Sequence, residues 1–301
     1  MPTTVNDLGT LRALTKGLRA EFFDAFNAAL ATSIRGQIAT EIRTNSEGED
    51  YAWLGSAPSV REFTDERQVK ALTGYSFYLA NKVWENTIGI DRAALDHDKL
   101  GMIMPRIRDL GIEAARYQDQ LVMEVLAAGS DTLCYDGQYL IDTDHVSGES
   151  GSQSNKGTTA LSVTSLQAAI TAMRKFKNDR GVAMGIRPNL LVVPPDLAWT
   201  AQEIVGSPNR PDTTVNVKNV LDGMLQVHVS PYLTDTNNWY LMDTTRGMKP
   251  LIFQLDAPVE FQSQTEESES GFMRAQYMYG TYARYNAGPG LWQCVYGAIV
   301  T

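Results

Sequence analysis

Four side chains near the middle of the sequence have the types and spacing best suited to chemistry. Asp136, Asp142, Asp144 and His145 lie within one short segment, and carboxylates beside an imidazole can hold a divalent cation. A polar turn after a strand over 138–141 accounts for the same residues, because turn aspartates accept hydrogen bonds from nearby backbone amides. We favour the turn. The alternative is a two-lobed α/β metal-dependent enzyme that uses Asp142, Asp144 and His145.

Other patterns that could bind a substrate lack the spacing that their chemistry requires. None of the three histidines stands in an HExxH pair or beside a GxSxG elbow. The segment GSQSNKGT at 151–158 places its lysine before the glycine, unlike a phosphate-binding loop. Asp91, Asp96 and Asp98 precede a predicted helix, where carboxylates stabilise the N-terminus. We therefore expect no catalytic residue, no cofactor, no metal site and no enzymatic activity.

The composition is that of a globular chain with an acidic balance. The 301 residues are 43% hydrophobic and 20% charged, which is enough to bury a core in one large or two smaller domains. The net charge of −9 argues against sequence-independent binding to nucleic acid, because such binding depends on Lys and Arg neutralising phosphates. Aromatic residues are not interleaved with basic ones, so the sequence offers no platform for stacking bases.

Cysteine use and hydropathy bear on the compartment. Cys134 and Cys294 form no CxxC pair, and we expect both to be small buried residues in a reducing compartment. The longest apolar runs fall far short of the ~20 residues of a bilayer-spanning helix, and Met1–Thr4 starts no signal peptide. We therefore expect a protein without a membrane segment that is soluble and intracellular when made.

Two amphipathic helices are predicted in the N-terminal half. Apolar residues at steps of three and four predict a helix over 8–30 and a second, stronger one over 105–128. Pro105 suits the first turn of the second helix, so we expect a break or kink there. This helix would be ~36 Å long, long enough to serve as a spine.

An irregular excursion is predicted between these helices. Residues 41–72 lack any sustained period and carry glycines and a proline, which predicts a long loop. Period-two alternation over 75–79 and 84–90 predicts two antiparallel strands that meet near 80–82. Loops of this length inside compact domains usually have a function.

The second half divides at the Gly- and Ser-rich segment 148–159, which is the best internal boundary. Beyond it, helices alternate with buried strands and predict a compact α/β unit over 159–247, followed by a β-rich end. The expected helices cover 164–177 and 196–205, and the expected strands cover 189–193, 225–229, 239–242, 251–255, 259–262, 272–285 and 291–296.

A series of segments, in order along nearly the whole chain, strongly resembles the major head subunits of Mu-like phages. One departure is Val146, which stands where the family has a proline and affects only that local turn. The resembling segments are Tyr51–Phe63 (YAWLGSAPSVREF), Tyr75–Glu85 (YSFYLANKVWE), Ile90–Arg92, Asp98–Gly101, Asp142–His145, Asn189–Pro194 and Gly290–Gln293.

The resemblance implies an α+β capsid fold of the Hong Kong 97 type, and the predicted elements are compatible with it. The implied parts are an N-terminal arm, an extended loop, a peripheral domain with a long spine helix, and an axial domain. We assign them to 1–35 (arm helix), 36–92 (loop and hairpin), 93–158 (peripheral domain with spine helix), 159–247 (axial domain) and 248–301 (peripheral C-terminal strands).

The function implied is that of a structural protein that assembles in the host cytoplasm into an icosahedral shell around double-stranded DNA. The implied partners are further copies of the chain in hexamers and pentamers. Because no long scaffolding domain precedes the loop, we expect a separate scaffold protein, a maturation protease and a portal. The negative charge suits a container that must not trap its polyanionic content. A related shell of the same fold, an encapsulin-type nanocompartment, is the alternative.

Apolar groups on the predicted loop are candidates for contacts between subunits. Trp53, Leu54 and Phe63 are costly to leave in water over a large patch, so we expect them to lie against a neighbouring copy. Arg61, Glu62 and Arg67 are expected to make polar contacts around them. Folding of the segment back onto its own domain is the alternative. The helix over 8–30 poses the same choice between its own domain and a neighbour.

Overall fold

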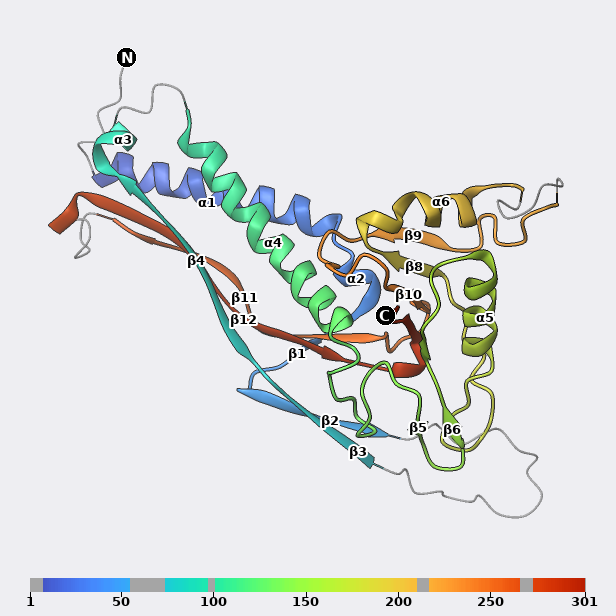
Figure 1. The fold of residues 1–301 in the computed structure, drawn as a ribbon. Coiled ribbons are helices and arrows are strands. Elements are labelled where there is room, and N and C mark those ends of the chain that lie inside the picture. The colour runs from blue at the N-terminus through green and yellow to red at the C-terminus, as the bar shows by residue number, and fades with distance from the viewer. Residues whose placement is uncertain (1–7, 55–73, 97–100, 210–216, 266–272, 301) are drawn as a thin grey trace, which may run out of the picture.

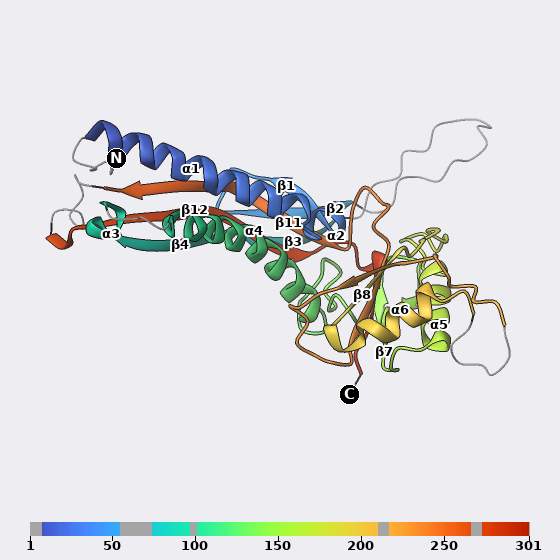
Figure 2. The same ribbon diagram turned by 90° about the horizontal axis from the view of Figure 1, so that it is seen from above.

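The computed structural model describes residues 8–54, 74–96, 101–209, 217–265 and 273–300. Over these residues the chain forms two lobes (Figures 1 and 2). The long lobe consists of long helices on a long sheet, and the compact lobe is built around a second sheet.

A four-stranded sheet runs along the long lobe in the order β1-β11-β12-β4. The pairs β11–β12 and β12–β4 are antiparallel, whereas β1 runs parallel to β11. The strands are β1 (Ala39–Arg43), β4 (Lys82–Asp91), β11 (Leu251–Gln264) and β12 (Gln276–Pro289).

Two long helices, α1 (Leu8–Ala31) and α4 (Ile103–Ala127), cover one face of this sheet (Figure 1). Phe22 of α1, Ile107 of α4 and Tyr279 of β12 are buried in the same core cluster. Both predicted helices are confirmed. Pro105 lies in the first turn of α4, where its missing N–H costs no hydrogen bond, so the expected break is the start of the helix.

The end of α1 is fastened to α4 by one carboxylate. Asp119 of α4 accepts hydrogen bonds from the Ser33 hydroxyl at 2.5 Å and from the backbone N–H of Arg35 at 3.0 Å. The short helix α2 (Arg35–Ile38) begins there and leads into β1. The first helix thus packs on its own chain. A second short helix, α3 (Arg92–Asp96), follows β4.

The compact lobe contains a five-stranded sheet in the order β7-β13-β10-β8-β9. Its central strands β8 and β10 are buried at every residue, as expected of apolar runs covered on both faces. The elements are β7 (Lys156–Gly157), β8 (Leu190–Val193), β9 (Gln226–Val229), β10 (Trp239–Met242), β13 (Val295–Ala298), α5 (Val163–Arg174), η1 (Pro195–Leu197), α6 (Ala198–Gly206), η2 (Trp292–Cys294) and a two-residue ladder of β5 (His145–Val146) with β6 (Ser152–Gln153).

The predicted hairpin around 80–82 is wrong. β3 (Gly74–Ala80) and β4 follow one another along a single line and do not pair with each other (Figure 1). β3 pairs with β2 (Gly48–Leu54), whereas β4 pairs with β12. The alternation of side chains between two faces is the same in a hairpin and in a strand that continues in one direction. It therefore could not distinguish them.

Three further expectations about strands need correction. Residues 41–72 are not loop throughout, because β1 and β2 lie in 39–54; the segment 55–73 is outside the described residues. The strands expected over 251–255 and 259–262 are one strand, β11, whose register shifts at 255/257 and 257/260. No strand covers 138–141, where a single bridge joins Leu133 to Tyr139.

The C-terminal strand lies in an unexpected lobe. We assigned 248–301 to the peripheral domain, but β13 pairs with β10 and β7 in the sheet of the compact lobe. The short helix η2 turns the chain from β12 into this second sheet. One cluster of buried residues, with Phe253 and Tyr285 from the long lobe and Trp239 and Trp292 from the compact lobe, joins the two. None of the helices in the described part of the chain is long and apolar enough to cross a bilayer.

We predict that Gly111→Val loosens α1 from α4. A Cβ atom at Gly111 would lie 2.6 Å from the backbone oxygen of Phe22, so the helices must separate, at a cost of about 1–3 kcal/mol. Urea unfolding measures the loss, and limited proteolysis reports release of α1. Gly17→Ala is the control, because a Cβ there meets nothing within 4 Å and favours the helix by up to about 1 kcal/mol. Equal stability of Gly111→Val and the unmodified protein would contradict the close crossing.

Candidate functional site

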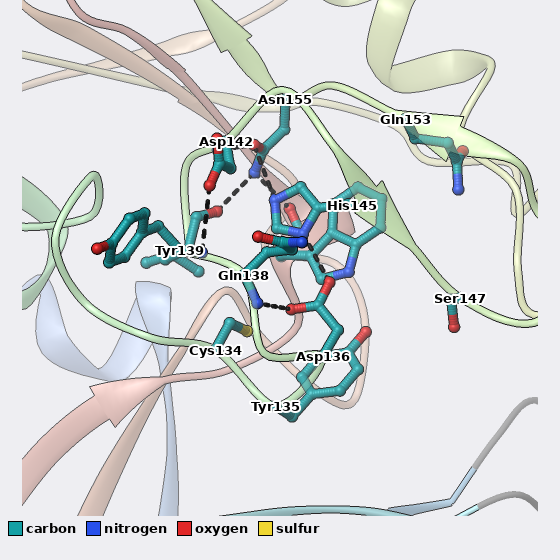
Figure 3. Close-up of polar contacts among 12 residues, drawn as sticks. Cys134, Tyr135, Asp136, Gln138, Tyr139, Asp142, His145, Ser147, Gln153 and Asn155 are labelled. Carbon is teal, nitrogen blue, oxygen red and sulfur yellow. Dashed lines mark hydrogen bonds and ion pairs between the residues drawn. The ribbon is translucent and has the colours of Figure 1, made fainter.

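The residues best suited to chemistry form a buried pair. His145 Nδ1 lies 2.7 Å from Asp136 Oδ2, and both side chains are fully buried. The imidazole stacks on the indole of Trp292, with ring centroids 4.0 Å apart and planes within 7°. Figure 3 shows His145 enclosed between Asp136 and Asn155. A substrate could not reach this pair without opening the fold.

Asn155 fixes the other side of the imidazole. Its Nδ2 donates to the backbone oxygens of Leu140, Trp292 and Val295, at 2.7, 3.3 and 3.2 Å, and its Oδ1 accepts from the N–H of Asp142 at 2.8 Å. The same Oδ1 lies 3.2 Å from His145 Nε2. Both ring nitrogens therefore face oxygen atoms.

The other aspartates of the segment do not join this pair. Asp142 accepts from the N–H groups of Tyr139 and Thr143, at 3.4 and 2.8 Å, as a turn aspartate does. Asp144 is exposed. Within the described residues, no three His, Cys, Asp or Glu side chains are grouped as metal ligands are. Asp142 therefore behaves as the polar-turn interpretation expects, whereas Asp136 pairs with His145 inside the fold.

The location of the pair indicates a structural role. Asp136, His145 and Asn155 lie in the segment that follows α4, whereas Trp292 lies in the turn between β12 and β13. Both segments connect the long lobe to the compact lobe. The pair and Asn155 therefore hold the junction of the lobes together.

The two thiols are unsuited to chemistry. Cys134 and Cys294 are both free and buried. Burial raises the pKa of the Cys294 thiol to about 12, and it raises the pKa of Cys134 further. Both stay in the unreactive thiol form at neutral pH.

The second candidate is the two-stranded ribbon formed by β2 and β3. Seven residue pairs join its strands, from Gly48 opposite Ala80 to Leu54 opposite Gly74. The ribbon lies on the face of the long sheet opposite α1 and α4 (Figure 1). It is a sheet of its own and adds no strand to the larger one. Its far end leads into 55–73.

Two buried amides fasten the near end of this ribbon to the sheet. Gln254 of β11 donates from Nε2 to the backbone oxygen of Leu79 at 3.1 Å and to Asn81 Oδ1 at 2.8 Å. Its Oε1 accepts from the Tyr51 hydroxyl at 2.6 Å. Asn286 of β12 donates to the backbone oxygen of Ala80 at 2.7 Å. Burial raises the pKa of Tyr51 to about 12, so its hydroxyl remains a donor.

Sequence reasoning missed both amides. The available signal was a glutamine inside the apolar run Leu251–Leu255 (LIFQL), because a polar side chain within a buried strand requires a partner. The structure describes only part of the predicted interface. Trp53 and Leu54 belong to β2, where they pair with Tyr75 and Gly74 of β3. Arg61, Glu62, Phe63 and Arg67 lie outside the described residues.

The sequence matches the family described as Mu-like prophage major head subunit gpT, over residues 11–160, 156–233 and 234–300. The Mu-like prophage FluMu major head subunit of Haemophilus influenzae is 28% identical over 94% of this chain and 71% of its own length. The major capsid protein of Escherichia phage Mu is 25% identical over 94% of this chain and 72% of its own.

Several solved structures with a similar fold come from capsids or a virus-like particle. A chain of the procapsid of bacteriophage JBD30 is 28% identical, with a TM-score of 0.57 over 96% of this chain and 76% of that one. A chain of the JBD30 capsid, 25% identical, has a TM-score of 0.59 over 68% of this chain and 92% of that one. A virus-like particle from Pyrococcus furiosus shares the fold alone, at 11% identity and a TM-score of 0.60, over 94% of this chain and 98% of that one.

We predict that His145→Phe destabilises the protein by about 3–5 kcal/mol, because the carboxylate of Asp136 stays buried without its partner. Chemical denaturation measures the loss. Replacing the pair together, as Asp136→Leu with His145→Phe, should recover most of it.

Asp144→Asn serves as the control and should change stability by less than about 0.5 kcal/mol, because Asp144 is exposed. Loss of stability when a chelator is added to the unmodified protein would contradict this assignment and support the cation site.

Proposed function

The chain belongs to the Mu-like prophage major head subunit gpT family and is the major capsid protein of a tailed phage, and we propose that its β2–β3 ribbon extends onto a neighbouring copy in the shell. The observation that carries this proposal is the attachment of the ribbon. Four hydrogen bonds from Gln254, Asn286 and Tyr51 hold its near end, whereas strands β2 and β3 pair only with each other.

The near end of the ribbon packs on the sheet through Phe77 and Leu79, whereas a two-stranded ribbon without such packing is marginally stable in water. Contact with a second copy would supply the missing apolar burial at its far end. We propose that Trp53, Leu54 and Phe63 provide this burial. Arg61, Glu62 and Arg67 would form the polar rim, since charged groups suit the edge of an interface more than its centre.

We propose that copies of the chain meet one another in both hexamers and pentamers of the shell. We propose that the long lobe is the peripheral domain, with α4 as the spine helix, and that the compact lobe is the axial domain. A segment anchored at one end can adapt to slightly different neighbours, whereas two rigid patches cannot.

Other proteins of the head are proposed as partners. We propose a separate scaffold protein, a maturation protease and a portal, with assembly in the cytoplasm of the bacterial host. Double-stranded DNA is the proposed content, held without sequence-specific contacts. The net charge of −9 supports this, because an acidic wall repels phosphates.

We propose that the chain has no catalytic role. The one Asp–His pair of the described residues is sealed inside the junction of the lobes, and both thiols are buried. A buried pair whose nitrogens are already matched has no free atom for a substrate. Its use is therefore to hold the fold.

We predict that replacing both Trp53 and Leu54 with Ser gives a folded chain that assembles poorly, because the change removes apolar contact between copies. Circular dichroism tests the fold, and sedimentation with negative-stain microscopy counts shells. Val146→Ser with Val182→Ser is the matched control, since both valines are about half exposed, at 51% each, and neither belongs to β2 or β3. Normal shells from the Trp53/Leu54 variant would refute the contact.

We also predict that the chain expressed entirely alone gives aggregates or shells of mixed size, because curvature is not fixed by one subunit. Size distributions from electron microscopy provide the measurement. Uniform shells from the isolated chain would remove the need for a scaffold protein.

A further inference from the structure

A cluster of basic side chains lies at the end of α5 in the compact lobe. The segment Arg174–Arg187 (RKFKNDRGVAMGIR) holds five basic residues and one acidic residue, although the whole chain has a net charge of −9. Figure 1 shows α5 on the side of the compact lobe away from the long lobe. A net charge averages over the chain and does not describe a local surface. This surface therefore differs in sign from the chain as a whole.

Four of the five basic side chains are exposed to solvent. Lys175 and Lys177 lie on either side of Phe176, which is buried. Arg174, in the last turn of α5, and Arg187 are exposed as well. Among the residues that the structure describes, none of these four side chains forms an ion pair. Their charges are therefore available to a partner.

Hydrogen bonds hold the two arms of this segment together. The N–H of Met184 donates to the backbone oxygen of Phe176 at 2.8 Å. Arg246 donates to the backbone oxygen of Met184, and its Nε lies 3.8 Å from the carboxylate of Asp243. That carboxylate also accepts the N–H of Arg187 at 2.8 Å. These contacts join both ends of the basic segment and add a further guanidinium beside it.

The turn between the two arms is fixed as well. Asn178 Oδ1 accepts from the N–H groups of Arg180 and Val182, at 3.0 Å each. Gln153 holds the backbone of Lys177, because its Nε2 donates to the oxygen at 3.1 Å and its Oε1 accepts the N–H at 2.7 Å. A surface that is already ordered loses less conformational freedom on binding than a mobile basic tail does.

The chemistry of this surface favours phosphates over another protein. Lysine is depleted at protein–protein interfaces, whose centres are apolar, whereas here lysine and arginine surround a single half-exposed aliphatic group, Val182. Lys and Arg that neutralise phosphates supply sequence-independent affinity for nucleic acid. Asp179 and the exposed Glu149, whose N–H donates to the backbone oxygen of Asp179 at 2.7 Å, limit the basic surface on one side. It therefore suits a few phosphates.

We propose that the basic patch formed by Arg174, Lys175, Lys177 and Arg187 binds the phosphate backbone of the double-stranded DNA inside the shell. This inference rests on the proposed function, which supplies DNA as the content. Contacts confined to one small patch hold the duplex near the wall at a few points, while the acidic remainder of the chain repels it. The patch reads no base sequence, because phosphate contacts carry none.

Fluorescence anisotropy of the full chain with short labelled DNA duplexes of two unrelated sequences tests the contact. The variant replaces Lys175, Lys177 and Arg187 with Gln. Labelled polyglutamate serves as a second probe, which represents an acidic polypeptide surface. The matched control replaces Arg12, Lys16 and Arg19 of α1 with Gln, because these side chains are also exposed and the change in net charge is the same. Circular dichroism verifies the fold of both variants.

The unmodified chain should bind both duplexes with similar affinity. Three phosphate contacts predict a loss of about forty-fold in affinity between about 50 and 200 mM salt. The triple variant should lack this part of the salt dependence and bind at least about ten times more weakly at the lower salt, whereas the control retains it. Lys177→Gln alone should lower the slope of log affinity against log salt by about one.

Three results would overturn the patch as a DNA contact. They are no binding of the duplexes by the unmodified chain at the lower salt, an equal weakening in the α1 control, and tighter binding of polyglutamate than of DNA. Shells from the triple variant provide a further check by negative-stain microscopy. Loss of shells in this variant alone would show that the patch meets another copy, which also overturns the inference.

The same microscopy separates this inference from the proposed function. Shells formed by the unmodified chain with its head partners, together with no duplex binding, would overturn the patch and leave the proposed function intact. Failure of the unmodified chain and its head partners to form any shell would overturn the proposed function itself. The contact with enclosed DNA would then fall with it.

Discussion

The buried amides of Gln254 and Asn286 are the constraint on which the shape of the long lobe depends. They lie opposite each other on β11 and β12, inside a sheet whose other face is filled by α1 and α4. A buried amide without partners costs about 1–3 kcal/mol, so the chain must bring polar groups to them. Those groups are the backbone oxygens of Leu79 and Ala80 and the side chains of Asn81 and Tyr51. The amides therefore fix where the ribbon leaves the sheet, although the ribbon adds no strand to it.

The junction of the lobes depends on a second set of satisfied polar groups. Asn155 receives one N–H and serves three carbonyl groups from separate segments, while His145 stacks on Trp292. These contacts lie next to the core cluster shared by the lobes. A buried polar network that is only partly satisfied is less stable than an apolar core. Loss of one member of this network is therefore expected to remove the stabilising effect of the others. The residues most like an active site are thus used to make one rigid subunit from two sheets.

The sequence indicated the helices and the central strands well, because their apolar periods are long. Prediction from the sequence failed where one local pattern is compatible with two different tertiary arrangements. The alternation over 75–90 fits a hairpin and a continuing strand equally, and only the distant partner β12 decides between them. The placement of β13 in the compact lobe was also beyond local reasoning, since η2 redirects the chain within three residues. At the candidate site, the turn role of Asp142 was predicted, but the pairing of His145 with Asp136 required the fold. The roles of Gln254 and Asn286 could not be read, because a polar residue in a strand reveals that it needs a partner but not which one.

These features together suit the assembly that we propose, in which one rigid subunit meets different neighbours. The shared core holds the two sheets in one orientation. Bending at the junction would disrupt this close packing, so it is an unfavourable way to fit different positions in a shell. The ribbon is fixed at its near end by four hydrogen bonds, and beyond Tyr51 its strands pair only with each other. A lever held at one end changes the position of its far end by small rotations about the anchor. In the assembly that we propose, a tilt between neighbours would be taken up within the ribbon and not within the core of either subunit. Such an arrangement suits the hexamers and pentamers that we propose.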